Sequence, residues 1–202
     1  YKENGKSLEK FTKSFKWRLI TEEKGEDLKN FRRTYGYYDV LLIDVEGNIL
    51  FTVGEEADLG TNLFTGKYSD TRFAKSCRKT LETGHNSFSD FERYEPSGDG
   101  AAGFITSVIV DEWGDILGLI AFQIPIDQLD KIMQSRIGLG ETGETYLIGS
   151  DLLMRSNSPM VEESTILKEK IDTEQTNSWY DEHIKEGQIE CDSDPFIYDG
   201  YK

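Results

Sequence analysis

The strongest local signal for structure is YYDVLLIDVEGNILFTV, from Tyr37 to Val53. Two short apolar runs, Val40–Ile43 and Ile49–Val53, flank the tripeptide Glu46-Gly47-Asn48. Apolar runs of this length, bounded by Gly and Asn, are typical of β-strands rather than helices. The stretch therefore predicts a β-hairpin with a tight turn at its tip.

A similar pattern returns at residues 145–157, TYLIGSDLLMRSN, with an offset of 105 residues between Leu42 and Leu147. Solenoid units are shorter than this period, so it indicates two copies of a domain. The first copy runs from about Tyr37 to Asp127. We expect the second copy, which starts near Glu141, to be incomplete at Lys202 and the chain to be a fragment of a longer polypeptide.

Apolar residues at helical spacing predict an amphipathic helix pair, or one long interrupted helix, over residues 1–35. The break is expected near Gly25 and the end at Gly36. Such a segment can be a dimerisation stalk or can cover the back of a sheet, and the sequence leaves both open. The apolar positions are Leu8, Phe11, Phe15, Leu19, Leu28, Phe31 and Tyr35.

The first copy continues with a structured excursion over residues 54–70, a helix and three further strands. The helix is predicted at 71–82 with a stop at Gly84, and the strands at 86–94, 104–110 and 116–124, with a long loop at 95–103. This order predicts an α+β fold in which a five-stranded antiparallel sheet carries helices on one face, in a PAS-like arrangement. Asp127 is expected to cap a helix over 128–136, and the polar stretches 165–170 and 173–186 lean toward helix.

We therefore predict four parts. They are an N-terminal helical stalk (1–36), a ligand-binding PAS-like lobe (37–127), an inter-lobe helix and linker (128–140) and a second, truncated PAS-like lobe (141–202).

Composition excludes several classes of function. A net charge of −15 argues against nucleic-acid binding, which needs Lys and Arg to neutralise phosphates. The two cysteines, Cys77 and Cys191, and the two histidines, His85 and His183, show no ligand spacing, so we expect neither a metal nor a cofactor. The calcium-loop pattern that starts at Asp44 fails because Ile49 stands where such a loop needs Gly.

No sequence motif predicts catalysis. The string Gly138-Leu-Gly-Glu-Thr-Gly143 has the GxGxxG form, but it follows a helix and precedes a strand, which is the reverse of a dinucleotide site. The concave side of a PAS-like sheet is instead a common place for a small ligand. Five residues are candidates to line such a site: Tyr68, Asp90, Tyr94, Thr106 and Gln123.

Gln123 is the most informative of them, because an amide within LIAFQIPI must find hydrogen-bond partners. A ligand can supply those partners, and so can the neighbouring backbone or water. Tyr68 and Tyr94 can equally be packing residues with exposed hydroxyl groups.

Several segments together resemble the double Cache sensor domains of bacterial and archaeal receptors. They are YYDVLLIDVEGNILFTV, DLGTNLFTGKYSD, FSDFERYEPS, FITSVIV, GDILGLIAFQIPID and GLGETGETYLIGSDLLMRSNS. The resemblance covers about residues 28–172. It implies a long N-terminal helix, a membrane-distal lobe that binds a small ligand and a membrane-proximal lobe.

The resemblance further implies the extracytoplasmic part of a membrane-spanning chemotaxis receptor or sensor histidine kinase, dimeric through its N-terminal helix. Family members that bind α-amino acids carry Arg-x-Trp-Tyr on the helical excursion and an Asp on the last strand of the membrane-distal lobe. This chain has Thr71-Arg72-Phe73-Ala74 and Gln123 at those places, so the class of ligand stays open. A structural spacer with a vestigial pocket is the alternative, followed by a hydrolase.

Overall fold

The computed structural model describes residues 7–135, 137–140 and 143–181. His183 and Cys191 lie outside the described residues, as do the last part of the predicted 173–186 helix and two residues of the predicted inter-lobe junction, Glu141 and Thr142. The chain divides into two compact units, Tyr1–Ile124 and Pro125–Lys202.

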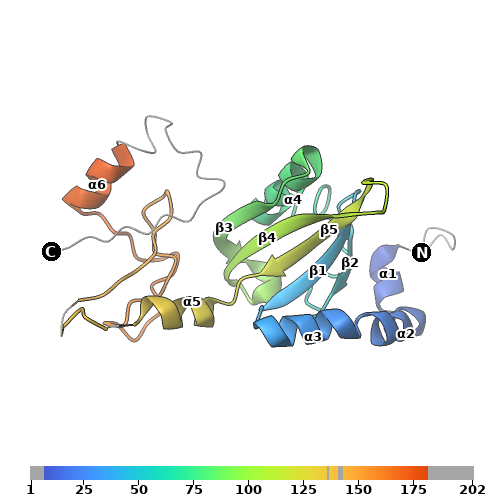
Figure 1. Cartoon of the computed structure of the whole chain (residues 1–202), viewed down its shortest axis with the longest axis horizontal. Coiled ribbons are helices and arrows are strands. Elements are labelled where there is room, and N and C mark those ends of the chain that lie inside the picture. Colours follow the sequence, from blue (N-terminus) through green and yellow to red (C-terminus); the bar gives the residue numbers. More distant parts are fainter. Residues whose placement is uncertain (1–6, 136, 141–142, 182–202) are drawn as a thin grey trace. The chain divides into compact units, whose positions relative to one another are not determined.

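Unit 1 contains a five-stranded antiparallel sheet with the strand order β2-β1-β5-β4-β3 (Figure 1). The sheet confirms the architecture predicted from the sequence. Its strands are β1 (Asp39–Asp44), β2 (Ile49–Thr52), β3 (Ser87–Tyr94), β4 (Gly100–Val110) and β5 (Ile116–Gln123).

The loop predicted over 95–103 was too long. A short 3-10 helix, η2 (Glu95–Ser97), is followed after two residues by β4, whose Ala101 and Ala102 pair with Arg93 and Glu92. The register of this pair shifts between Ser89 and Glu92, where a Cβ on Gly103 would lie 3.2 Å from the Ser89 carbonyl oxygen. Glycine there reflects close packing inside a strand rather than a loop.

The β1–β2 turn depends on one glycine and one carboxylate. Gly47 has φ +84°, and a Cβ there would lie 2.4 Å from the Phe64 ring. The Asp44 Oδ1 atom accepts hydrogen bonds from the backbone N–H groups of Glu46 (3.0 Å) and Asn48 (2.9 Å). Asp44 is therefore a turn residue.

The N-terminal segment forms three helices, α1 (Leu8–Thr12), α2 (Phe15–Lys24) and α3 (Glu26–Tyr35). The break at Gly25 and the end at Gly36, which has φ +71°, are as predicted. A further break, at Lys13 and Ser14, was not predicted. The Ser14 side chain accepts a hydrogen bond from the Trp17 backbone and so starts α2 as a new helix.

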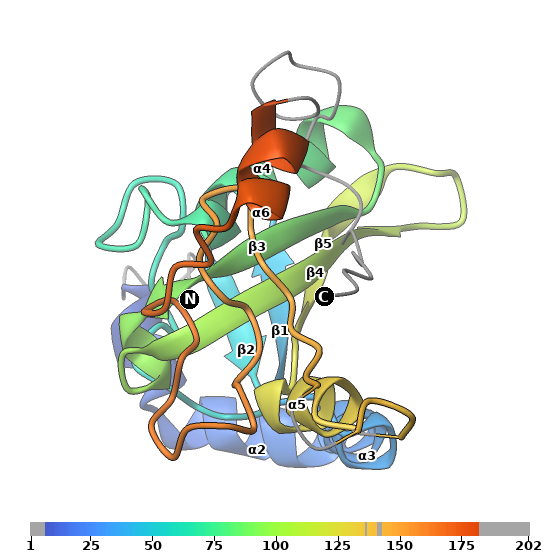
Figure 2. The ribbon, with the colours of Figure 1, turned by 90° about the vertical axis from the view of Figure 1, so that its left-hand side faces the viewer.

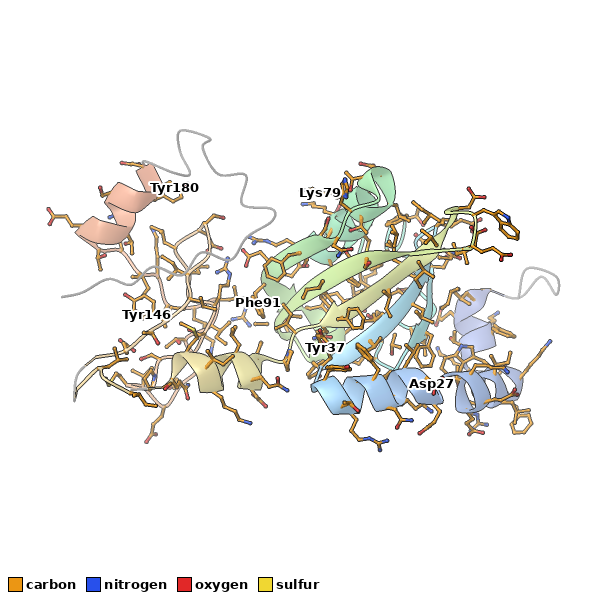
Figure 3. All side chains as sticks on the ribbon, viewed as in Figure 1. Asp27, Tyr37, Lys79, Phe91, Tyr146 and Tyr180 are labelled. Carbon is orange, nitrogen blue, oxygen red and sulfur yellow. The ribbon has the colours of Figure 1, made fainter. Side chains whose placement is uncertain are left out.

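Helices α2 and α3 pack on one face of the sheet. The Trp17 indole N–H donates to the Leu50 carbonyl (3.2 Å), and the Phe31 ring lies 5.4 Å from that of Phe122 on β5. Tyr37 is the third ring of this contact, 4.9 Å from Phe122 (Figure 3). Residues of α2 and α3 thus cover the back of the sheet, the second of the two roles left open by the sequence.

Helix α4 (Arg72–Thr83) packs on the opposite face (Figure 2). The prediction of helices on one face only was therefore wrong. Thr71 caps α4 through its side chain, and Gly84 ends it with φ +69°, close to the predicted bounds. The core between α4 and the sheet consists of Leu41, Ile43, Ile49, Leu63, Tyr68, Phe73, Ala74, Cys77, Tyr94, Ala102, Phe104, Leu119 and Ala121.

Unit 2 begins with α5 (Ile126–Met133) and ends its described part with α6 (Glu174–Tyr180). The predicted cap was wrong: Pro125 is the N-cap, and Asp127 lies inside the first turn, because the helix starts earlier than expected. Residues 165–170 form no helix: residues 166–168 are a turn in which Leu167 has φ +56°, and Lys170 forms a bridge to Leu153.

The turn of the β1–β2 hairpin has a counterpart 105 residues later in the chain. Ile43 pairs with Ile49, and Ile148 forms a bridge to Met154, which preserves the offset between Leu42 and Leu147. Gly47 and Leu152 occupy the matching turn positions, and both have positive φ, +84° and +63°. The second hairpin is reduced to isolated bridges, but its turn has the same geometry as the first.

Candidate functional site

The candidate site lies at one end of the sheet in unit 1, where two polar residues of adjacent strands meet. Asp39 on β1 is opposite Gln123 on β5. Alternation along β1 places Asp39 on the same face as the core residues Leu41 and Ile43. Asp39 is 1% exposed and Gln123 is 3% exposed, so both groups are removed from water.

Asp39 fastens the end of β1 to the segment after β2. Its Oδ1 atom accepts hydrogen bonds from the backbone N–H groups of Val40 (2.7 Å) and Gly54 (2.8 Å). A Cβ on Gly54 would lie 2.9 Å from Asp39 Oδ2, so only glycine allows this approach. The pKa of Asp39 is raised, mainly by burial. The two backbone hydrogen bonds and the charge of Arg32 lower this pKa, and the charge of Glu56 raises it.

Asp58 is the second buried carboxylate and the least satisfied. The Tyr94 hydroxyl donates a hydrogen bond to Asp58 Oδ2 (2.8 Å), whereas Oδ1 is buried and accepts no hydrogen bond from the described residues. Burial raises the pKa of Asp58 to about 6, against the lowering effect of the Tyr94 hydrogen bond. The charges of Asp39 and Glu56 raise this pKa further.

Glu56 acts on Asp58 through its charge and is linked to Gln123 through the Ser97 hydroxyl. Tyr38 donates to Glu56 Oε1 (2.9 Å), and Ser97 donates to Glu56 Oε2 (2.8 Å). The Gln123 amide N–H in turn donates to the Ser97 Oγ atom (3.0 Å). We call Asp39, Glu56, Asp58, Tyr94, Ser97 and Gln123 together the polar cluster.

Aromatic rings border the polar cluster. The Tyr94 ring lies 5.8 Å from Tyr68, 6.0 Å from Phe73 and 5.2 Å from Phe104. Tyr94 is 1% exposed, and burial followed by the charge of Asp58 raises the pKa of its hydroxyl well above the usual range. The hydroxyl therefore stays protonated and remains a hydrogen-bond donor at neutral pH.

Three of the five sequence-predicted site residues, Tyr68, Tyr94 and Gln123, come together here, and two do not. The Thr106 hydroxyl lies under α4, 2.6 Å from the Thr80 hydroxyl and within reach of the Ser87 carbonyl (3.2 Å). Asp90 pairs with Arg72 at the start of α4, at 2.5 Å. Internal partners therefore account for Thr106 and Asp90.

Sequence reasoning missed Asp39, Glu56, Asp58 and Ser97. Asp39 had a usable signal, since Asp39, Leu41 and Ile43 alternate onto one face and place a carboxylate in a buried row. Asp58 had none, because an acid within GEEADLG resembles a solvated loop residue. Within the described part of the chain, no group of three or more His, Cys, Asp or Glu side chains is arranged to hold a metal ion.

A scan against protein-family models and a search of curated proteins found no match. Among solved structures, the chain is similar to the sensor domain of the histidine kinase DctB from Vibrio cholerae. The identity is 13% and the TM-score 0.53, over 89% of this chain and 64% of that one.

A second similar structure is the ligand-binding domain of the chemoreceptor Tlp3 from Campylobacter jejuni, solved with 4-methylisoleucine. Here the identity is 17% and the TM-score 0.51, over 72% of this chain and 56% of that one. The chain thus spans less than two thirds of either neighbour. Both similarities establish the fold, which is the PAS-like, Cache-type fold of receptor sensor domains.

The helices of the described ranges include none with the length and apolar content that a membrane span requires.

Proposed function

We propose that the chain is the extracytoplasmic small-ligand sensing region of a membrane-spanning signalling receptor, either a histidine kinase or a chemotaxis receptor. Both neighbours with this fold are sensor domains of such receptors. The observation that carries the proposal is the polar cluster, in which the Asp58 Oδ1 atom is buried without a hydrogen bond from the described residues. A buried carboxylate oxygen left in this state destabilises the fold, and a ligand that donates to it removes the cost.

The polar cluster also favours a sensor over a spacer. A spacer domain gains no stability from buried polar groups, because apolar groups of the same shape can replace them at almost no cost in stability. Buried polar groups therefore favour a role beyond that of a spacer. Here Asp39, Asp58 and Gln123 are at most 3% exposed. We assign no catalytic role to the chain and treat the output module as a separate part of the receptor.

The test is a thermal-shift screen of the 202-residue chain against amino acids, carboxylates, amines, sugars and purines. A ligand at 100 times its dissociation constant stabilises the folded state by about 2.7 kcal/mol, which is a rise in Tm of roughly 5–10 °C for a chain this size. The rise is expected to be lost in Asp58→Asn and kept in Glu112→Gln, which changes an exposed acid in the β4–β5 turn. If no compound class raises the Tm, small-ligand sensing by this chain is wrong.

We further propose a homodimer through the N-terminal helices. Helix α2 buries Trp17 against the sheet but leaves Phe15, Leu19 and Ile20 between 45% and 67% exposed. Size-exclusion chromatography with light scattering should show a dimer that Leu19→Glu converts to monomer. The control Trp113→Glu, at a 79% exposed position in the β4–β5 turn, should leave the mass unchanged. A monomeric wild-type chain would contradict the assignment.

A further inference from the structure

We propose that the polar cluster recognises an organic ammonium group and that its ligand is an amine without a carboxylate. Asp58 is the ion-pair acceptor, Tyr94 orients it, and Tyr68 and Phe73 supply the aromatic wall. The inference deepens the sensing function proposed above and rests on it.

The first argument is the balance of charge. Asp39, Glu56 and Asp58 are close enough for their charges to act on one another. Among the described residues, no lysine or arginine forms an ion pair with any of the three, although the charge of Arg32 lowers the pKa of Asp39. Buried charge of one sign needs a counter-charge, and a ligand cation supplies it.

The second argument is the unsatisfied atom. Asp39 accepts two backbone hydrogen bonds, and Glu56 accepts hydroxyl hydrogen bonds on both oxygens. Asp58 differs from both because its Oδ1 atom is fully buried and accepts no hydrogen bond from the described residues, and the residue is 1% exposed. An ammonium group has three N–H donors and no acceptor, so it matches a carboxylate oxygen beside two further acids.

The third argument is that the positions suited to a ligand carboxylate are already filled by the chain. At the start of α4, the Glu92 Oε1 atom accepts the Phe73 backbone N–H at 2.9 Å. Arg72 pairs with Asp90 at 2.5 Å. Arg72 and the Phe73 backbone N–H are the groups in the first turn of α4 that attract an anion, and each faces an internal carboxylate. A ligand with its own carboxylate would have to compete with Asp90 and Glu92.

The fourth argument concerns the rings. Tyr68, Phe73 and Phe104 surround the Tyr94 ring with centroid distances of 5.2–6.0 Å. Aromatic faces attract ammonium groups and their attached carbon chains, and the Tyr68 ring already has the Lys67 ammonium 5.4 Å from its centroid. Glu56 and Asp58 lie on the segment between β2 and α4, which has no regular strand or helix and is held to Ile49 of β2 by backbone hydrogen bonds at Gly60 and Thr61.

Binding should also release a proton. The pKa of Asp58 depends on Asp39 from β1, Tyr94 from β3 and Glu56 from its own segment. Of the nearby cations, Arg32 acts on the pKa of Asp39, and Lys67 forms an ion pair with Glu95. With a pKa of about 6, Asp58 is partly protonated in mildly acidic solution. An arriving ammonium group stabilises the carboxylate, and the displaced proton passes to the buffer.

The experiment titrates the chain by calorimetry with matched probes. One set is 2-phenylethylamine, phenylalanine and 2-phenylethanol, and the other is 3-methylbutylamine, leucine and 3-methylbutanol. We also titrate 1,4-diaminobutane, acetate and Ca²⁺ singly. We expect at least one amine to bind, its amino acid to bind at least tenfold more weakly and the alcohol not to bind. At pH 6 the apparent enthalpy should differ between phosphate and imidazole buffers, because binding releases protons.

Two variants localise the site. Asp58→Asn should raise the amine dissociation constant at least tenfold and abolish the buffer dependence, whereas Glu112→Gln should change neither. Tyr94→Phe, which keeps the ring, should weaken amine binding by a smaller factor. This variant tests the location of the site if Asp58→Asn does not fold.

Preference for an amino acid, acetate or Ca²⁺, or amine binding that Asp58→Asn leaves intact, overturns the amine inference and leaves small-ligand sensing standing. If neither these probes nor the wider screen yields a ligand, both proposals fall.

Discussion

Asp58 is expected to destabilise the unliganded chain at neutral pH, so Asp58→Asn should make it more stable. Burial raises the pKa of Asp58 from 3.8 in the unfolded chain to about 6 in the folded chain. Each pKa unit corresponds to about 1.36 kcal/mol, so the ionised carboxylate costs roughly 3 kcal/mol. Asn keeps an oxygen to accept the Tyr94 hydrogen bond and removes the buried charge.

The pH dependence follows from the direction of that shift. A carboxyl group with a raised pKa in the folded state contributes its full stability below pH 3.8 and loses it as the pH rises through about 6. Between pH 5 and pH 7.5 this loss amounts to about 1.4 kcal/mol. The advantage of Asp58→Asn over wild type should therefore grow by about that amount across this window.

Urea denaturation monitored by tryptophan fluorescence at several pH values measures the difference. Glu112→Gln is the matched control, since an exposed acid should give a difference that is nearly independent of pH. A constant difference between wild type and Asp58→Asn, or a lower stability of the variant at pH 7.5, refutes the account of Asp58 as a buried charge without adequate partners.

Three further predictions concern the frame of unit 1. Phe73→Ala should lower the free energy of unfolding by about 3–5 kcal/mol in urea titrations, because this fully buried ring stacks on Phe104 at 3.9 Å. Gly47→Ala should lower the free energy of unfolding more than Gly84→Ala. Both glycines have positive φ, but a Cβ on Gly47 would meet the Phe64 ring, whereas one on Gly84 would meet nothing within 4 Å. Gly84→Ala should therefore lower the free energy of unfolding by only about 1–2 kcal/mol. The Cys77 thiol, whose pKa burial raises, should resist alkylation at pH 8 until the chain is unfolded, as peptide mapping can show.

The strands and α4 of unit 1 were largely predictable because the sequence patterns that indicate them lie within each element. The hairpin around Gly47 was visible as two apolar runs around a turn, and α4 as a helical period that ends at Gly84. The second break at Ser14 was not, since the apolar spacing of residues 8–19 continues through it. The start of β4 was hidden because glycine and alanine residues look like a loop until the partner strand is known.

The polar cluster was only partly predictable, because it depends on contacts between distant residues. Gln123 and Tyr94 stood out within their own strands. Asp58 became important only when the segment after β2 placed it beside the Tyr94 hydroxyl, 36 residues away in sequence. Thr106 and Asp90 were chosen for their polarity, and their partners, Thr80 and Arg72, lie on a helix whose docking the sequence does not specify.

The same contacts explain how a neutral residue at position 123 is compatible with recognition of a cation. Gln123 stands directly across from Asp39 in the β1–β5 register. An acid at position 123 would face Asp39, and like charges on opposite strand positions destabilise a sheet. The carboxylates therefore come from Asp39 and from the segment that carries Glu56 and Asp58. Gln123 is neutral and is connected to Glu56 through hydrogen bonds with Ser97. On this reasoning Gln123→Asp should destabilise the unliganded fold and add no affinity for an amine, whereas Asp58→Asn should stabilise the fold and remove that affinity.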